Sequence, residues 1–177
     1  AITSHLLALG HRRFGLVSAP LAGNDRARER GAGMRQALAG AGLALDPRHV
    51  RYAAISLESA RAAAAEILAQ SLRPTAMVAT NDVFAVGTML ACRDAGIRVP
   101  EDVSVTGVDN TDLGATQTPP LTSVRTPIVE VGNAAALQLV ARLEGGTPPL
   151  QQVLPFELVL RGSTAAPPKL RARSRAA

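Results

Sequence analysis

A chain of 177 residues, 47% of them apolar, is long enough to bury the core of one large domain or two small ones. No apolar run approaches the roughly 20 residues that a membrane helix needs, and no signal peptide opens the chain, so we expect a cytoplasmic protein without membrane contact. The single cysteine, the scattered histidines and a +5 charge carried mainly by residues 169–177 predict no disulfide, metal site, cofactor or nucleic-acid surface in the body.

Apolar strands alternate with helices along the chain. Strands are expected at residues 14–20, 51–55, 76–80 and 104–110. Helices are expected at residues 1–10, 26–41, 59–72, 83–95 and about 128–144, with Ser59 as one N-cap. Because continuous apolar strands separated by helices form parallel sheets covered on both faces, we predict an α/β fold with a doubly wound, mostly parallel sheet. Cys92 lies in a predicted helix, where we expect a small buried side chain.

Polar side chains follow two of the predicted strands. Asp109 and Asn110 close SVTGVDN, and Asn81 and Asp82 follow AMVAT. The carboxyl ends of parallel strands meet at one edge of the sheet, where ligands bind, and Arg30, in the helix after the first strand, can reach that edge. Carboxylates accept hydrogen bonds, amides donate and accept, and Arg donates, so the set suits a polyhydroxylated or otherwise polar small molecule.

A purely structural role stays open for these residues when only their spacing is considered. Asn81 or Asp82 would be an ordinary N-cap for the helix at 83–95. Arg30 would be an ordinary solvated charge on its helix.

A long segment resembles the effector-binding domain of the lactose/galactose repressor family of bacterial transcription regulators: LRPTAMVATNDVFAVGTMLACRDAGIRVPEDVSVTGVDNTDLGATQTPPLTSVRTP. The resemblance continues through HLLALGHRRFGLVSAP, RERGAGMRQALAGAGL and LPFELVLRGST, and so covers about residues 1–166. It implies a periplasmic-binding-protein-like type I fold, in which two lobes close on a small effector, usually a sugar or a nucleobase. It also implies allosteric control of DNA binding rather than chemistry.

The same resemblance implies which residues touch the effector. The primary contacts are Arg30 in RERGAG, Asn81 in TND and Asp109 in GVDN. The secondary pocket positions are Ile55, Asp82, Asn110 and Thr126, with Asp82 expected to cap its helix or to buttress the loop. Relatives often carry an aromatic ring near AAISLES, where this chain has Ile55, so a nucleobase-like effector stays open beside a sugar-like one.

The domain organisation is implied in the same way. Residues 1–166 correspond to the C-terminal part of the effector-binding domain, mainly its C-terminal lobe. The helices at 1–10 and about 128–144 are expected to pack in an N-terminal lobe outside this chain. The second helix would then expose an apolar stripe of Val129, Gly132, Ala136, Leu139 and Leu143. Residues 167–177 are expected to be a basic, disordered tail.

Two partners follow from the resemblance. Operator DNA is expected to be read only by a helix-turn-helix domain that precedes these residues. A homodimer is expected, with Ala85, Met89 and Leu90 on the helix at 83–95 as a candidate face. The alternative is that these three residues belong to the core of a single chain.

Other functional classes find less support in the sequence. LVSAP lacks the GxSxG elbow of a hydrolase, and no order of Ser, His and Asp indicates a triad, so we predict no enzyme. The alternative that stays open is a solute-binding protein of a sugar transport system, which shares the fold.

Overall fold

The computed structural model describes residues 1–169. Its strands are β1 (Phe14–Ser18), β2 (Val50–Tyr52), β3 (Ala76–Ala79), β4 (Ser104–Val108), β5 (Thr122–Arg125) and β6 (Glu157–Val159). Its helices are α1 (Ile2–Ala8), α2 (Asp25–Gly40), α3 (Leu57–Leu68), α4 (Asp82–Asp94), α5 (Asp112–Ala115) and α6 (Ile128–Leu143), with a 3-10 turn at Pro47–His49. Residues 170–177 of the expected basic tail lie outside the described residues.

The strands form a single six-stranded sheet in the order β2-β1-β3-β4-β5-β6. Neighbouring strands from β2 to β5 are parallel, and only the β5–β6 pair is antiparallel. The predicted doubly wound, mostly parallel sheet is therefore confirmed. The strands β5 and β6 were not among the predicted ones, because TSVR and ELV are too short to give a clear apolar period.

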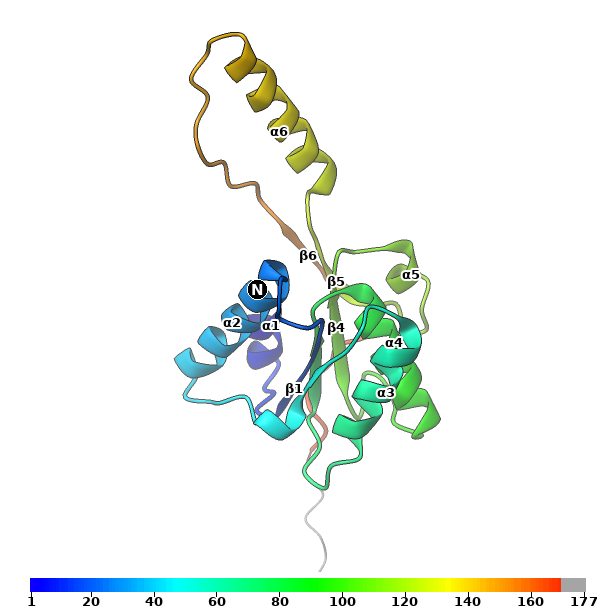
Figure 1. The fold of residues 1–177 in the computed structure, drawn as a ribbon. Coiled ribbons are helices and arrows are strands. Elements are labelled where there is room, and N and C mark those ends of the chain that lie inside the picture. The colour runs from blue at the N-terminus through cyan, green and yellow to red at the C-terminus, as the bar shows by residue number, and fades with distance from the viewer. Residues whose placement is uncertain (170–177) are drawn as a thin grey trace, which may run out of the picture.

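Helices cover both faces of the sheet, with α1 and α2 on one face and α3, α4 and α5 on the other (Figure 1). Successive strand residues point to opposite faces, so both faces bury apolar side chains. In β1, for example, Leu16 packs in the cluster that contains Met34 and Leu38 of α2. Its neighbour Val17 packs on the other side, in the cluster that contains Ile67 of α3 and Phe84 of α4.

Helix α1 belongs to this lobe. Ile2 and Leu6 are buried, Leu6 completely, and both pack with Phe14 and Leu38 in the cluster beneath α2. The expectation that residues 1–10 pack in another lobe is therefore wrong for this structure. The apolar spacing of Ile2 and Leu6 indicated a buried helix face, but it did not indicate which sheet that face would cover.

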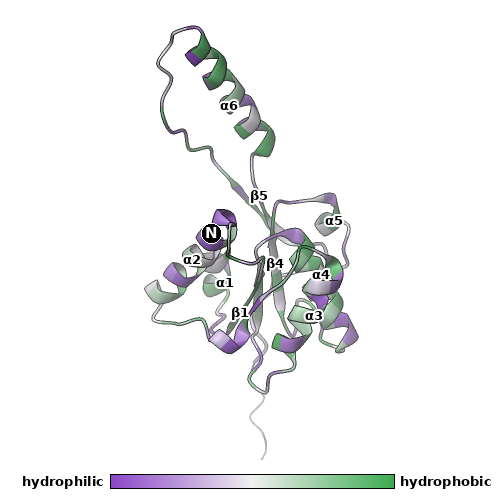
Figure 2. Cartoon of the chain, in the orientation of Figure 1, coloured by the Kyte–Doolittle hydropathy of each residue, from purple (hydrophilic) through white to green (hydrophobic). Residues whose placement is uncertain are grey.

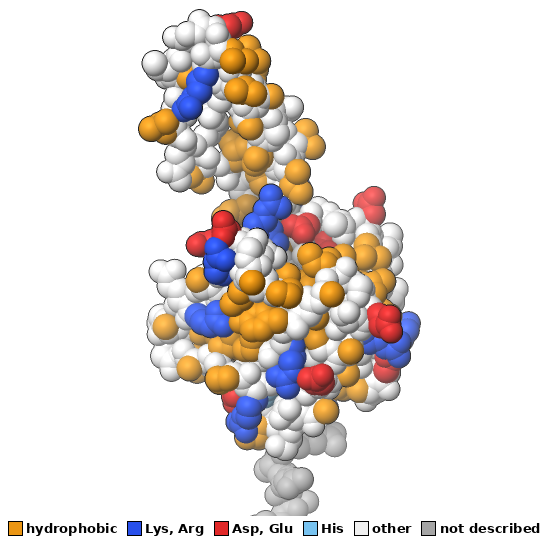
Figure 3. All heavy atoms as spheres, in the orientation of Figure 1, with side chains coloured by type: hydrophobic (Ala, Val, Ile, Leu, Met, Phe, Trp, Pro, Cys, Tyr) orange, Lys and Arg blue, Asp and Glu red, His pale blue; other side chains and the backbone are white. Residues whose placement is uncertain are grey.

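Helix α6 stands away from the body of the molecule. The chain leaves the sheet after β5, forms α6 and returns through β6 (Figure 1). No residue of α6 is buried. Hydrophobic residues are nevertheless frequent along it (Figure 2), and hydrophobic side chains gather on its surface (Figure 3). Its large exposed hydrophobic residues are Ile128, Val129, Val131, Leu137, Leu139, Val140 and Leu143.

The helices α3 and α4 pack side by side on one face of the sheet. The N-cap of α3 is Ser56, whose Oγ accepts a hydrogen bond from the backbone N–H of Ser59, so the predicted Ser59 cap is wrong by three residues. In α4, Ala85 and Met89 are buried in the chain's own core. The alternative that they are intrachain core residues is thus confirmed for these two, and Leu90 is half-buried at the surface.

Within residues 1–169, no helix is both long enough and apolar enough to cross a membrane.

Candidate functional site

The carboxyl ends of β1 and β3 mark the point where the order of the sheet reverses. From β1 the chain moves outward to β2, and from β3 it moves the other way to β4 and β5. Ligands of open α/β sheets bind at such a switch point, because the loops on either side diverge and leave a crevice. A pocket of about 230 Å³, here called the rim pocket, occupies this position, and its lining residues are Ala19, Asn24, Arg26, Ala27, Arg30, Ile55, Thr80, Asn81 and Asp109.

Arg30 spans the rim pocket from α2 to the sheet. Its Nη1 donates to the backbone carbonyl of Thr80 at 2.5 Å, and its Nη2 lies 3.2 Å from Asp109 Oδ1. Both side chains of this ion pair are only about 30% exposed, at 28% and 30%. The alternative that Arg30 is an ordinary solvated charge is therefore wrong. The pair holds a charged donor and a charged acceptor side by side at the strand ends.

Asn81 has both of the roles that its spacing left open. Its Oδ1 accepts a hydrogen bond of 2.9 Å from the backbone N–H of Phe84, so it is the N-cap of α4. Its side chain also lines the rim pocket. Because one lone pair of the amide oxygen is used in the cap, the NH2 group is the part of Asn81 with the most capacity left to bind another molecule.

Asp82 does not cap α4 and does not line the rim pocket. Its buried carboxylate accepts hydrogen bonds from the backbone N–H and the hydroxyl of Thr111, at 2.6 and 3.0 Å, and from Ser123 Oγ at 2.6 Å. Burial raises the pKa of this carboxyl group, although the three hydrogen bonds oppose the shift. Of the two expected roles for Asp82, the structure shows the buttress and not the cap.

The loop that Asp82 buttresses has an unusual backbone. Asp109 and Asn110 have φ angles of 104° and 53°, in the region that residues other than glycine rarely adopt. Ser123 Oγ, which donates to Asp82, accepts a hydrogen bond from the backbone N–H of Asn110 at 3.1 Å. A Cβ atom at Gly107 would collide with the carboxylate of Asp82. The glycine and the aspartate thus work together to hold the GVDN turn in a strained conformation.

Asn110 and Thr126 lie outside the rim pocket, contrary to the expectation that they are secondary pocket residues. The Oδ1 of Asn110 accepts a hydrogen bond from Arg161 Nη2 at 2.6 Å. Thr126 lines a larger, mainly apolar cavity of about 320 Å³ beyond Arg30 and Thr80, and its buried hydroxyl has no hydrogen-bond partner within residues 1–169.

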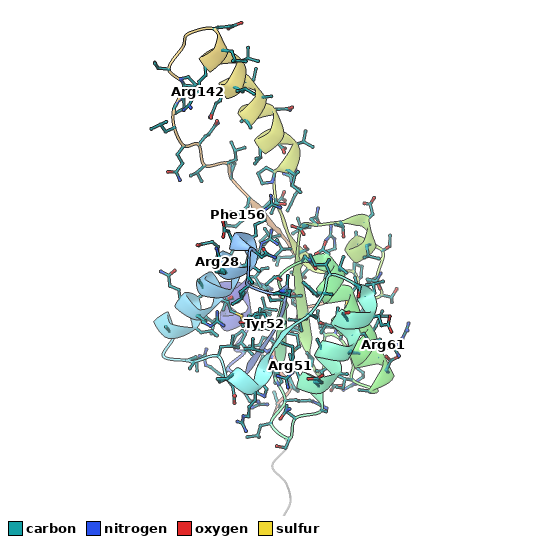
Figure 4. The ribbon with its side chains drawn as sticks, viewed as in Figure 1. Arg28, Arg51, Tyr52, Arg61, Arg142 and Phe156 are labelled. Atoms are coloured by element: carbon teal, nitrogen blue, oxygen red, sulfur yellow. The ribbon has the colours of Figure 1, made fainter. Side chains whose placement is uncertain are left out.

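Phe156, where the return strand meets the body (Figure 4), also lines this apolar cavity. Ile55, in contrast, does line the rim pocket, and it is 62% exposed there.

Sequence reasoning missed several residues around the rim pocket. Asn24 and Arg26 line it from the loop that precedes α2 and from the first turn of that helix. Their position directly after β1, in the same edge of the sheet as Asp109, was a usable signal. Thr111, Ser123 and Arg161 support the GVDN turn from distant parts of the chain, and no local pattern indicates such contacts.

Possible metal ligands and a single thiol are present within residues 1–169. Residues 1–169 contain no group of three or more His, Cys, Asp or Glu side chains that could hold a metal ion. Cys92 is fully buried, as expected, and burial raises the pKa of its thiol to about 12.

Comparison with known proteins identifies the family. The sequence-family model of the periplasmic binding protein-like domain matches residues 3–164. The HTH-type transcriptional regulator MalR of Streptomyces coelicolor is 37% identical over 175 residues, which are 96% of this chain and 50% of that protein. This chain therefore spans about half the length of the curated relatives that it matches.

Solved structures agree with this result. A sugar-binding transcriptional regulator of the LacI family from Escherichia coli, complexed with phosphate, superposes with a TM-score of 0.87 at 29% identity, covering 94% of this chain and 59% of that one. The lac repressor dimer bound to operator and the anti-inducer ONPF gives a TM-score of 0.85 at 33% identity, over 92% of this chain and 56% of that one. The chain belongs to the periplasmic binding protein-like domain family, in the branch formed by the effector-binding domains of LacI-type transcription regulators.

Proposed function

We propose that this chain is the greater part of the ligand-sensing domain of a bacterial transcription regulator and that it binds a small polar effector in the rim pocket. The observation that carries the proposal is the Arg30–Asp109 pair, which lies at the switch point of the sheet in a chain whose relatives are HTH-type regulators. A carboxylate and a guanidinium held side by side can accept from and donate to the hydroxyl or amide groups of a sugar-like or nucleobase-like molecule.

The proposed mechanism is linkage between effector binding and the arrangement of two lobes. The rim pocket is lined from one lobe, and a second lobe outside these residues is proposed to close over it. Helix α6 is proposed to belong to that second lobe, because none of its residues is buried here. An effector that binds the closed arrangement more tightly shifts the equilibrium toward it, and a homodimer then presents its DNA-reading domains differently.

Binding, rather than catalysis, is the proposed activity, and the cytoplasm is the proposed compartment. Operator DNA would be read by a helix-turn-helix domain outside residues 1–177. A solute-binding protein of a sugar transport system shares the fold, but the matched relatives are transcription regulators, which favours the regulator.

The proposal can be tested with the full-length protein that contains this chain. A thermal-shift screen against sugars, polyols and nucleobases identifies ligands, and a gel shift then measures whether each ligand changes operator affinity. Asp109→Gly removes the carboxylate but tolerates the positive φ of this residue, so it should abolish the ligand response while the unliganded protein stays folded. Asp112→Ala, an exposed carboxylate nearby, is the control and should respond normally. Normal binding by Asp109→Gly would contradict the proposal.

A further inference from the structure

The ionisable groups of the rim pocket do not balance. Its lining includes two guanidinium groups, Arg26 and Arg30, and one carboxylate, Asp109. Arg30 is paired with Asp109 and also donates to the carbonyl of Thr80. Arg26 forms no salt bridge within residues 1–169. The pocket therefore carries one positive charge without a partner.

Among the described residues, no acidic residue close to Arg26 in the sequence forms a salt bridge with it. Asp25 forms an ion pair with Arg28, which also donates to the carbonyl of Leu21 at 2.8 Å. Glu29 lines the apolar cavity and not the rim pocket. Asp82, the acid behind Asp109, has its carboxylate occupied by Thr111 and Ser123. None of these groups neutralises Arg26 within the pocket.

The neutral polar groups of the pocket are biased in the same direction. The Oδ1 atoms of Asn24 and Asn81 are both used as helix caps, accepting from the N–H groups of Ala27 and Phe84 at 3.0 and 2.9 Å. Each amide oxygen therefore has one lone pair already engaged, whereas each NH2 group offers two donors. The acceptors that remain are chiefly those of Asp109. The side chains that line the pocket therefore offer more donors than acceptors to a ligand.

The pocket also lacks a platform for the apolar face of a neutral sugar. None of its lining residues is aromatic. Tyr52, at the end of β2 (Figure 4), is 44% exposed but does not line it, whereas the aliphatic Ile55 does. Charge and hydrogen bonds, rather than ring stacking, are what these residues offer to a ligand.

From these observations we infer that the effector is an anionic, oxygen-rich metabolite. Its phosphate or carboxylate group binds Arg26 and the amide groups of Asn24 and Asn81, and a hydroxyl group donates to Asp109. The inference rests on the proposed function, since it names the chemical class of the effector for the same pocket. It makes Arg26 a specificity-determining residue: the guanidinium selects the anionic ligand over its neutral counterpart.

The experiment uses this chain and matched probes: inorganic phosphate, glucose 6-phosphate and glucose. Nitrogen-labelled protein is titrated, and the backbone amides of Ala27, Thr80 and Asn81 report on the rim pocket. Glucose 6-phosphate should shift these amides at roughly one tenth of the concentration that glucose requires, because the phosphate adds charge-assisted hydrogen bonds. Inorganic phosphate should shift the same amides, and roughly 0.5 M NaCl should weaken both anionic probes.

Two arginine variants provide the decisive comparison. Arg26→Ala should reduce the preference for glucose 6-phosphate to about twofold or less, since the unpaired guanidinium is gone. Arg28→Ala removes the same charge from the same helix, but Arg28 is occupied by Asp25 and Leu21 and does not line the pocket, so the preference should persist.

Three results would overturn the inference. Glucose and glucose 6-phosphate could act at equal concentrations, the two arginine variants could lose the preference equally, or phosphate could shift amides all over the surface and not those of the pocket. Each would leave the effector-sensing role intact, because that role is tested separately by the Asp109→Gly variant and the operator gel shift.

Discussion

The buried carboxylate of Asp82 supports the conformation of the GVDN turn through hydrogen bonds. It accepts from Thr111 and Ser123, and Ser123 in turn accepts from the backbone of Asn110. Removing the carboxylate would leave buried donors unpaired beside a backbone that is already strained at Asp109. The effect should be felt both in stability and in the position of Asp109.

We expect Asp82→Ala to lower the free energy of unfolding by about 2–4 kcal/mol. Asp82→Asn should cost only about 1–2 kcal/mol, because its carbonyl oxygen can still accept from Thr111 and its NH2 group can donate to Ser123. Urea unfolding followed by circular dichroism measures both values. Equal costs for the two variants would mean that the amide introduced by Asp82→Asn does not replace the carboxylate as a partner of Thr111 and Ser123.

His11 ties the start of the sheet to the C-terminal segment. The ring is fully buried, with Nδ1 2.9 Å from Thr75 Oγ1 and Nε2 2.9 Å from the carbonyl oxygen of Ala165. Burial lowers the pKa of His11, and the positive charge of nearby His5 lowers it further, while the hydrogen bond to Ala165 opposes the shift. The folded chain therefore prefers the neutral ring.

This shift predicts a stability that falls with acidity. As pH drops below about 6.5, His11 is protonated in the unfolded chain but stays neutral in the folded chain. Protonation therefore favours the unfolded chain, and the free energy of unfolding decreases. Urea unfolding at about pH 7.5 and about pH 5.5 should show this loss in the parent chain. His11→Gln should be less stable at the higher pH but should lose less on acidification. The control is His5→Gln, since burial also lowers the pKa of His5 but it is less buried, so its contribution to the pH dependence should be smaller.

At the scale of the elements, the close contact between α3 and α4 depends on Gly87. A Cβ atom there would collide with Ala60 of α3 and lie 3.0 Å from the backbone of Leu57 and Arg61. The backbone atoms cannot move aside without separating the helices, so Gly87→Ala should destabilise the chain by about 1–3 kcal/mol.

Gly33 is the matched control for this prediction. It lies in the interior of α2, and a Cβ atom added to it meets nothing within 4 Å. Gly33→Ala should therefore stabilise the chain by about 0.5–1 kcal/mol, as expected for a helical glycine without contacts. Chemical unfolding of both variants compares the signs directly. A gain in stability for Gly87→Ala would show that the two helices are less tightly constrained than their contact indicates.

Elements defined by local sequence patterns could be predicted, whereas elements defined by contacts between distant parts of the sequence could not. β1 to β4 and their helices have strong local periods, and the strand ends brought Arg30, Asn81 and Asp109 to one edge as expected. The pairing of β5 with β6 and the packing of α1 depend on partners far away in the sequence. The same holds for Asn110, whose partner Arg161 no local pattern identifies.

At the scale of the whole molecule, the excursion through α6 should be separable from the lobe. Arg125 and Glu157 are paired across the β5–β6 ladder, and their side chains lie 3.0 Å apart. Replacing residues 126–156 by Asn-Gly would join this pair by a two-residue hairpin turn. Since no residue of α6 is buried, we expect the free energy of unfolding to stay within about 1 kcal/mol of the parent.

The shortened chain should also associate less, because it no longer exposes the apolar residues of α6. Analytical ultracentrifugation compares the two chains over a range of concentrations, and urea unfolding checks the fold. Loss of cooperative unfolding in the shortened chain would mean that the excursion supports the lobe after all.

The single antiparallel ladder of the sheet has one more consequence. Arg125 and Glu157 are paired in the β5–β6 ladder, so residues 126–156 are attached to the sheet in the same way as the loop of a β-hairpin. The entropic cost of closing such a loop grows only with the logarithm of its length, so the stability of the lobe should depend only weakly on the length of the inserted segment. We therefore expect that a segment or domain inserted between Arg125 and Glu157 can be lengthened, replaced or removed without changes to the buried core of the lobe.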